Sequence, residues 1–138
     1  MVKFYVVLIL TVIFDQLSKY IIRLQQPDVV LIPNILNITF ITNTGASFGI
    51  LQNMNALLLV LSLAVIIGLI VYLKKNPKQR SLPFALILAG ALGNSIDRII
   101  HGAVTDFISF SFWPAFNVAD SAITVGVILL LVSEWKKK

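Results

Sequence analysis

The chain has 138 residues, of which 58% are hydrophobic and only 12% are charged, and its formal net charge is +5. A soluble domain carries about 25% charged residues, so this composition excludes an ordinary water-exposed domain and indicates an integral membrane protein. The absence of cysteine excludes disulfides, cysteine-ligated zinc and a thiol nucleophile. The length fits a single domain, 1–138, and no interleaved aromatic and basic stretch predicts a nucleic-acid partner.

Four apolar segments have close to the ~20 residues that a bilayer-spanning helix requires. In chain order they are 4–22, 56–73, 81–100 and 118–135. The first is interpreted as a retained helix rather than a signal peptide, because no small-residue cleavage site follows its apolar run. The outer connections are then 24–55 and 101–117. In 24–55, β-branched and aromatic residues alternate in part and follow a Pro-Asn turn, which predicts a small strand pair ending in a glycine-rich turn.

The basic residues predict the orientation of these spans. Eight of the eleven fall on one side of a four-span topology: Lys3, Lys74, Lys75, Lys78, Arg80, Lys136, Lys137 and Lys138. By the positive-inside rule, both termini and the loop around residue 78 are cytoplasmic, and 24–55 and 101–117 face outward. The same clusters are expected to contact anionic membrane lipid.

Polar residues lie on one face of three spans, near the outer end of each. They are Thr11, Asp15, Ser18 and Lys19 on the first span, Gly90, Asn94, Asp97, Arg98 and His101 on the third, and Asn117, Asp120 and Thr124 on the fourth. Ionisable residues inside spans are rare and indicate function by default. We therefore expect one polar site near the outer membrane face, where the three stripes meet.

Taken singly, these groups also fit structural roles. Asp15 and Lys19 form an i,i+4 pair that could simply close a helix end, and Arg98 could extend to the membrane interface. Gly90 and Gly93 fit close helix packing better than a phosphate-binding loop. With one histidine and no cysteine, a conventional zinc site is improbable, and neither a metal nor a cofactor is expected.

The stretch VTDFISFSFWPAFNVADSA places Asp106 and Asp120 in an otherwise apolar run. A serine triad is implausible with one histidine, and Ser18 beside Lys19 is badly aimed for a dyad. Two aspartates within hydrogen-bond reach share one proton, so that one activates water while the other polarises a carbonyl. This chemistry hydrolyses an amide, and the spacing permits the pairing without requiring it.

Five motifs in order resemble those of the lipoprotein signal peptidase (signal peptidase II) family of bacterial membrane aspartyl peptidases. They are DQLSK at 15–19, NTGASFG at 43–49, GNSIDR at 93–98, GAVTDF at 102–107 and FNVADSAI at 116–123. The resemblance implies an all-α membrane protein: four transmembrane helices with a small extracytoplasmic β-cradle and a short amphipathic outer segment. Ser47 and Thr105 depart from the motifs, which commonly have an alanine and an apolar residue at these positions.

The resemblance also implies a function. Members are endopeptidases that remove the signal peptide of prolipoproteins immediately before a diacylglyceryl-modified cysteine, in the bacterial cytoplasmic membrane and near its outer face. Globomycin is their characteristic inhibitor. The resemblance makes Asp106 and Asp120 the catalytic dyad. Residues that support the site or bind substrate are then Asp15, Lys19, Asn43, Gly45, Asn94, Asp97, Arg98 and Asn117, with a structural role for Asp97.

Two other classes of function compete with this interpretation. A small proton- or ion-coupled transporter would use the acids as a relay and would distribute them through the membrane depth. A non-enzymatic assembly factor would use the polar stripes to bind a partner helix. A monomer is expected, because one chain supplies both aspartates.

Overall fold

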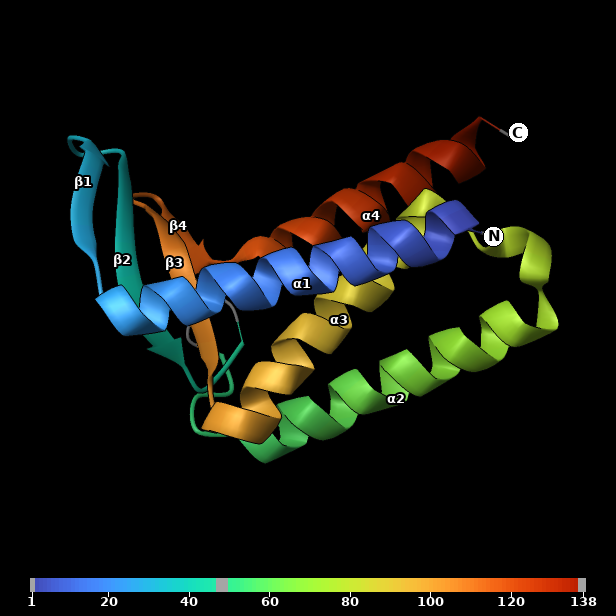
Figure 1. Ribbon diagram of the computed structural model, residues 1–138, viewed down its shortest axis with the longest axis horizontal. Coiled ribbons are helices and arrows are strands. Elements are labelled where there is room, and N and C mark those ends of the chain that lie inside the picture. Colours follow the sequence, from blue (N-terminus) through green and yellow to red (C-terminus); the bar gives the residue numbers. More distant parts are fainter. Residues whose placement is uncertain (1, 47–49, 137–138) are drawn as a thin grey trace.

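The computed structural model describes residues 2–46 and 50–136, so Ser47, Lys137 and Lys138 lie outside the described residues. The chain is mostly helical, with one small sheet (Figure 1). The elements are α1 (Val2–Gln25), β1 (Asp28–Ile32), β2 (Leu36–Asn43), α2 (Asn55–Lys75), the 3-10 helix η2 (Pro77–Gln79), α3 (Leu82–His101), β3 (Val104–Phe110), β4 (Trp113–Phe116) and α4 (Val118–Trp135). The four predicted helices are confirmed, and α1 and α2 extend a few residues beyond the predicted bounds.

The sheet stands at one end of the helices, and both chain ends and the α2–α3 turn lie at the opposite end (Figure 1). The central helix is α3, which packs against α1, α2 and α4. By length and composition, α1, α2 and α3 are able to cross a membrane, and α4 contains a shorter apolar helix over Val118–Ser133. This arrangement agrees with the predicted grouping of both termini and the α2–α3 turn on one side.

The outer faces of the helices are apolar. Large hydrophobic side chains such as Leu10, Phe14 and Leu17 are exposed along α1, and α2 buries only Ile66 and Leu73. A soluble monomer rarely exposes so continuous an apolar surface, which instead matches the hydrocarbon of a bilayer. The apolar surface and the helix lengths therefore both indicate a membrane protein.

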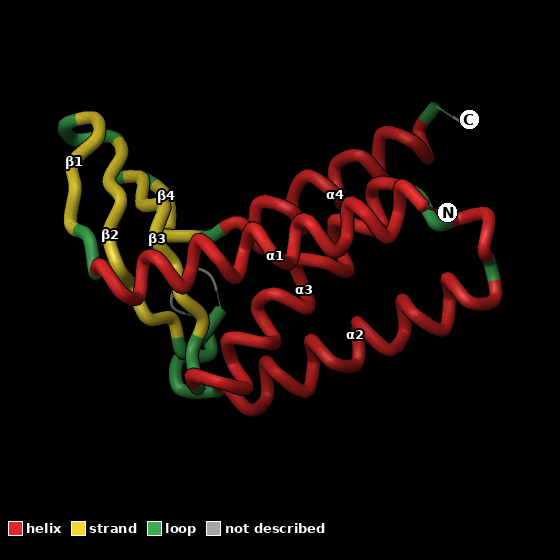
Figure 2. The backbone as a smooth tube through the Cα atoms, viewed as in Figure 1, coloured by secondary structure: helices red, strands yellow, loops and turns green. Residues whose placement is uncertain are grey.

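The sheet contains four antiparallel strands in the order β1-β2-β3-β4 (Figure 2). The predicted strand pair in 24–55 is confirmed as β1 and β2. Segment 101–117 was expected only to connect two helices, and the structure corrects this, because the segment forms β3 and β4. Residues 104–107 are all buried, so β3 lacks the alternation of inward and outward side chains by which a half-exposed strand is recognised.

The interior of the helix bundle is divided between two kinds of core. Toward the chain ends, an apolar cluster forms around Phe4, Leu73, Phe84 and Leu88. Toward the sheet, the largest fully buried side chains are polar: Lys19, Asn117, Asp15, Asp97 and Asp106. Burying charged groups is costly unless each has partners, so the sheet end is where a specialised site is expected.

Candidate active site

Asp120 is held by the first turn of α4. The backbone N–H of Asp120 donates to Asn117 Oδ1 (3.0 Å), and the backbone N–H of Asn117 donates to Asp120 Oδ2 (3.2 Å). This reciprocal arrangement is a capping box, with an asparagine N-cap and an acid at the third helical position. The Ala119 N–H donates to Asp15 Oδ1 (2.8 Å), so α1 also contributes to the start of α4. Local helix capping therefore orients the Asp120 carboxylate.

Asp106 is carried by β3 and is 1% exposed. Asn43, at the end of the neighbouring strand β2, donates from Nδ2 to Asp106 Oδ2 (2.9 Å). The Asn43 side chain is itself oriented, because its Oδ1 accepts the Gly45 N–H (2.9 Å). Asn117 donates from Nδ2 to the other Asp106 oxygen (2.7 Å). Both oxygens of this carboxylate thus accept hydrogen bonds from amides.

Asn117 joins the two aspartates, since its side chain donates to Asp106 and its backbone donates to Asp120. Asn94 on α3 completes the arrangement by donating to Asp120 Oδ1 (2.8 Å). The Asn94 oxygen accepts a hydrogen bond from Lys19 Nζ (2.8 Å). Two carboxylates fourteen residues apart in sequence therefore share a common partner.

Burial raises the pKa of Asp106 from its ordinary value of 3.8 to about 6. The hydrogen bonds from Asn43 and Asn117 and the charge of Lys19 oppose this rise, and the negative charge of Asp120 adds to it. Proton uptake by Asp106 therefore falls within the range in which a carboxyl group serves as a general acid or base.

A separate ionic network lies between α1 and α3. Lys19 Nζ is 2.9 Å from Asp15 Oδ2 and 3.6 Å from Asp97 Oδ2, and all three side chains are buried. Arg23 Nη1 is 3.3 Å from Asp97 Oδ2. Two acids are thus matched by two bases. Through Lys19 and Asn94, this network connects to Asp120.

Arg98 contacts the loop that follows β2, because its Nη2 donates to the carbonyl of buried Gly45 (3.2 Å). The eight predicted supporting residues form successive layers of contacts around the two aspartates. Asn43, Asn94 and Asn117 bond to the carboxylates, and Lys19 and Gly45 bond to these asparagines. Asp15, Asp97 and Arg98 bond in turn to Lys19 or Gly45. Within the described residues, neither Asp106 nor Asp120 bonds to the remaining polar side chains of the stripes, which are Thr11, Ser18, His101 and Thr124. His101 and Thr124 are exposed, and the Ser18 hydroxyl donates locally to the Asp15 carbonyl (2.8 Å).

The sequence did not single out Gln16, Arg23 or Asn55. Gln16 Nε2 donates to the Gly93 carbonyl (3.0 Å) and lies within hydrogen-bonding distance of Asp15 and Asp97. Asn55 Nδ2 donates to the Arg98 carbonyl (3.4 Å). Arg23 was detectable, because it is four residues beyond Lys19 and so continues the polar stripe of α1. Gln16 was detectable by the same period, because it lies three residues before Lys19 and seven before Arg23.

The predicted packing role of two α3 glycines is confirmed. A Cβ at Gly90 would collide with the carbonyl oxygen of Ala119, and one at Gly93 would collide with the Asp15 carboxylate. The missing side chains therefore allow α3 to approach α4 and α1 closely enough for the polar contacts to form.

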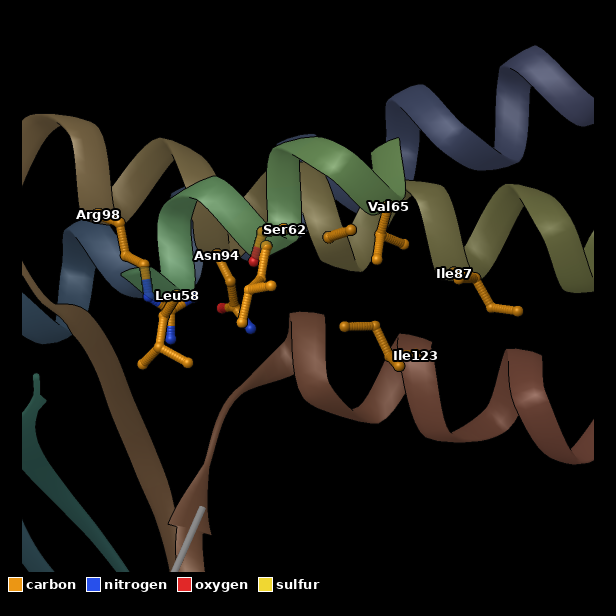
Figure 3. A pocket seen from close by; sticks show the side chains of 9 residues that line it. Leu58, Ser62, Val65, Ile87, Asn94, Arg98 and Ile123 are labelled. Carbon is orange, nitrogen blue, oxygen red and sulfur yellow. The ribbon is translucent and has the colours of Figure 1, made fainter. Parts of the chain in front are cut away.

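Among the described residues, two cavities lie beside Asp120 or its hydrogen-bond partner Asn94. One, of about 270 Å³, lies between α2, α3 and α4. Figure 3 shows Asn94 and Arg98 at one end of it, and Val65, Ile87 and Ile123 toward the other.

The second cavity, of about 420 Å³, is lined by Trp113, Phe116, Asp120, Ser121, Thr124 and Val125. Asp120 thus borders one cavity directly and reaches the other through Asn94. Each cavity is lined by polar residues at one end and by apolar side chains along the rest of its wall.

Across the described parts of the chain, no three His, Cys, Asp or Glu side chains cluster as a metal site.

A family model described as signal peptidase (SPase) II matches residues 7–136. The chain is 41% identical to the lipoprotein signal peptidase of Thermodesulfovibrio yellowstonii, over 93% of this chain and 91% of that protein. It is 38% identical to the lipoprotein signal peptidase of Staphylococcus aureus, over 91% and 83% of the respective chains.

A bacterial membrane enzyme solved by the in meso method at 2.3 Å resolution superposes with a TM-score of 0.87 at 37% identity, over 99% of this chain and 89% of the other. The chain therefore belongs to the signal peptidase II family and is a membrane-embedded peptidase.

Proposed function

We propose that this peptidase removes the signal peptide of prolipoproteins immediately before a diacylglyceryl-modified cysteine, with Asp106 and Asp120 as an aspartic dyad. The observation that carries the proposal is the shared partner Asn117, which donates a hydrogen bond to each carboxylate. A dyad needs two carboxylates close enough to share a proton, and the raised pKa of Asp106 favours a singly protonated pair.

In the proposed reaction, the ionised carboxylate takes a proton from water and the resulting hydroxide attacks the scissile carbonyl carbon. The protonated carboxyl group donates its proton to the carbonyl oxygen, which gives a neutral tetrahedral gem-diol. As this species collapses, the carboxyl group that took the water proton donates it to the amide nitrogen and the C–N bond breaks. The other carboxylate takes a hydroxyl proton from the gem-diol, which becomes the product carboxylic acid, so the dyad again holds one proton. The cycle forms no covalent enzyme intermediate.

The surrounding residues orient the dyad in this proposal. Asn43 and Asn117 set the direction of the Asp106 carboxylate. Asn94 fixes Asp120 and is itself held by Lys19. Asp15 caps α4, Asp97 binds the start of β3, and Arg98 holds the Gly45 loop beside the site. We assign the contacts with the substrate peptide to these same supporting residues.

The two cavities suit a substrate that is both peptide and lipid. Each has an apolar wall and begins at the aspartates or at their amide partner. The acyl chains and the apolar signal segment would stay in the hydrocarbon while the scissile bond reaches the polar end. We place the protein in the bacterial cytoplasmic membrane, as a monomer with cytoplasmic termini and with the sheet outside. Buried Asp15, Asp97 and Asp106 and half-buried Asp120 gather at the sheet end, which disfavours a transmembrane proton relay.

The test is a cleavage assay with purified protein and two lipobox peptides that differ only in the diacylglyceryl group on cysteine. We expect cleavage directly before the modified cysteine, inhibition by globomycin, and little cleavage of the unmodified peptide. Equal cleavage of both peptides would refute the lipid requirement. No cleavage of the modified peptide by folded protein would refute the proposed function.

A further inference from the structure

Thr105, directly before Asp106 on β3, is bound from three sides. Its backbone N–H donates to Asp97 Oδ2 on α3 (2.9 Å), and its carbonyl accepts from Asn117 Nδ2 at the start of α4 (3.2 Å). Its hydroxyl accepts from Arg23 Nη1 on α1 (2.7 Å). The residue is 2% exposed. Every polar group of Thr105 is thus held by a different helix or helix end.

Arg23 connects two of these partners. The same guanidinium nitrogen that donates to the Thr105 hydroxyl lies 3.3 Å from Asp97 Oδ2. The Arg23 side chain is 20% exposed, so it sits at the edge of the buried network. A short hydrogen bond from a charged donor is stronger than one between neutral groups, and partial burial reduces its screening by water. Arg23 therefore holds Thr105 rather than only balancing the charge of Asp97.

Thr105 and Asp106 are neighbours on β3, and their side chains point to opposite faces of the strand. Because the N–H, carbonyl and hydroxyl of Thr105 are all held, they fix the backbone from which the Asp106 carboxylate projects on the other face. We propose that Arg23 and Thr105 form a positioning clamp that sets the direction of Asp106 in the dyad, an inference that rests on the proposed aspartic function. Neither residue is a catalytic residue. Their effect on the reaction passes through the backbone of β3.

A clamp of this kind matters because proton transfer depends on the placement of the acid and base. Displacement of a reacting group by about 1 Å costs up to about 10²-fold in rate. The Thr105 hydroxyl contributes one of several contacts, so its removal is expected to shift Asp106 by less than this. We expect a loss of about tenfold.

The experiment compares Thr105→Val, Arg23→Gln and the double variant with Thr42→Val as a matched control. Thr42 pairs with Thr105 across β2 and β3, but it is exposed. In the lipobox peptide assay, Thr105→Val should lower kcat about tenfold, change KM less than about twofold, and shift the acid limb of the pH–rate profile. Thr105→Ser should restore kcat. The double variant should be no slower than Arg23→Gln, and Thr42→Val should match wild type.

The alternative is that the clamp serves only stability. Thr105→Val would then lower Tm while kcat per folded molecule and the pH profile stay at wild-type values, and this result would overturn the proposal. A rise in KM at constant kcat would assign Thr105 to substrate binding and would also overturn it. Fully additive effects of the two single variants would contradict a shared clamp.

A measurement without substrate separates this inference from the proposed function. If wild type cleaves nothing, the proposed function fails, and the clamp is judged by carbon NMR titration of the Asp106 carboxyl. We expect a midpoint near 6 in wild type, displaced by at least about half a unit in Thr105→Val and Arg23→Gln but not in Thr42→Val. Identical midpoints in all variants would overturn the clamp.

Discussion

Four aspartates lie at the sheet end of the bundle, and they are stabilised in two different ways. Asp15 and Asp97 face cations: Lys19 reaches both, and Arg23 reaches Asp97. Asp106 and Asp120 instead accept hydrogen bonds from asparagines. Within the described residues, no ion pair of 4.0 Å or less involves either of them.

Under the proposed function, this difference separates the two structural acids from the two catalytic acids. Opposite charges offset the desolvation of Asp15 and Asp97 and join α1 to α3. Amide donors offset the desolvation of Asp106 only in part, so its pKa remains raised to about 6 and proton exchange stays accessible near neutral pH. An ion pair at Asp106 would strengthen the charged form and would remove this property.

The largest expected effect is on turnover. Asp106→Asn and Asp120→Asn should each lower cleavage of the modified lipobox peptide by at least about 10³-fold, because an amide neither accepts the water proton nor donates to the carbonyl. Initial rates of purified variants measure this loss. Asp28→Asn, the same change on the exposed strand β1, is the control and should leave the rate unchanged. Robust turnover by either dyad variant would break the assignment.

Substitution of an ion-paired aspartate should lower the free energy of unfolding. Asp15→Asn leaves Lys19 buried without its 2.9 Å partner, and breaking a buried pair costs about 3–5 kcal/mol of unfolding free energy. Denaturant unfolding in micelles measures the change. The double variant Asp15→Asn/Lys19→Met removes both charges and should recover part of the loss. If Asp15→Asn proved as stable as wild type, the ionic network would have no architectural role.

The pH dependence of stability should distinguish Asp106 from an ion-paired acid. Its folded-state pKa is raised, so it favours the folded state below about pH 4, and this contribution is lost as pH rises from 4 through about 6. From pH 4 to about 6, wild type should therefore lose stability relative to Asp106→Asn, and its Tm should fall relative to that of the variant. The expected loss in unfolding free energy over this range is about 3 kcal/mol. A difference that moved in favour of wild type would show a lowered pKa instead.

The smallest expected effect concerns the close packing of α3 against α1 at Gly93. Gly93→Ala places a methyl group against the Asp15 carboxylate and should cost about 1–3 kcal/mol of unfolding free energy. Gly68→Ala on α2 is the control, because its Cβ would meet nothing within 4 Å, and it should stabilise the helix by up to about 1 kcal/mol. Equal effects of the two substitutions would show that α1 and α3 are not closely packed at Gly93.

Much of the molecule was predictable from local patterns. Apolar runs predicted the four helices, and the helical period predicted that Asp15, Lys19, Asn94 and Asp120 lie near one another. The strand β3 was not predicted, because burial of four successive residues removes the alternation of a half-exposed strand. The strand β4 was not predicted either, because its four residues are too few to show a period. The helical period places Arg23 on the polar face of α1, but its pairing with Thr105 was not predictable, since the two residues are 82 apart in the chain.

The sequence by itself determined the number of helices, the polar faces of three of them and the i,i+4 pair of Asp15 and Lys19. These features depend on residues within a few turns of one another, where the helical period dictates which side chains are neighbours. Only the tertiary structure decided that Asp97 also faces cations, whereas Asp106 and Asp120 face amides. Asn43 reaches Asp106 across 63 residues, and Asn94 reaches Asp120 across 26, through strand register and the packing of helices without side chains at Gly90 and Gly93.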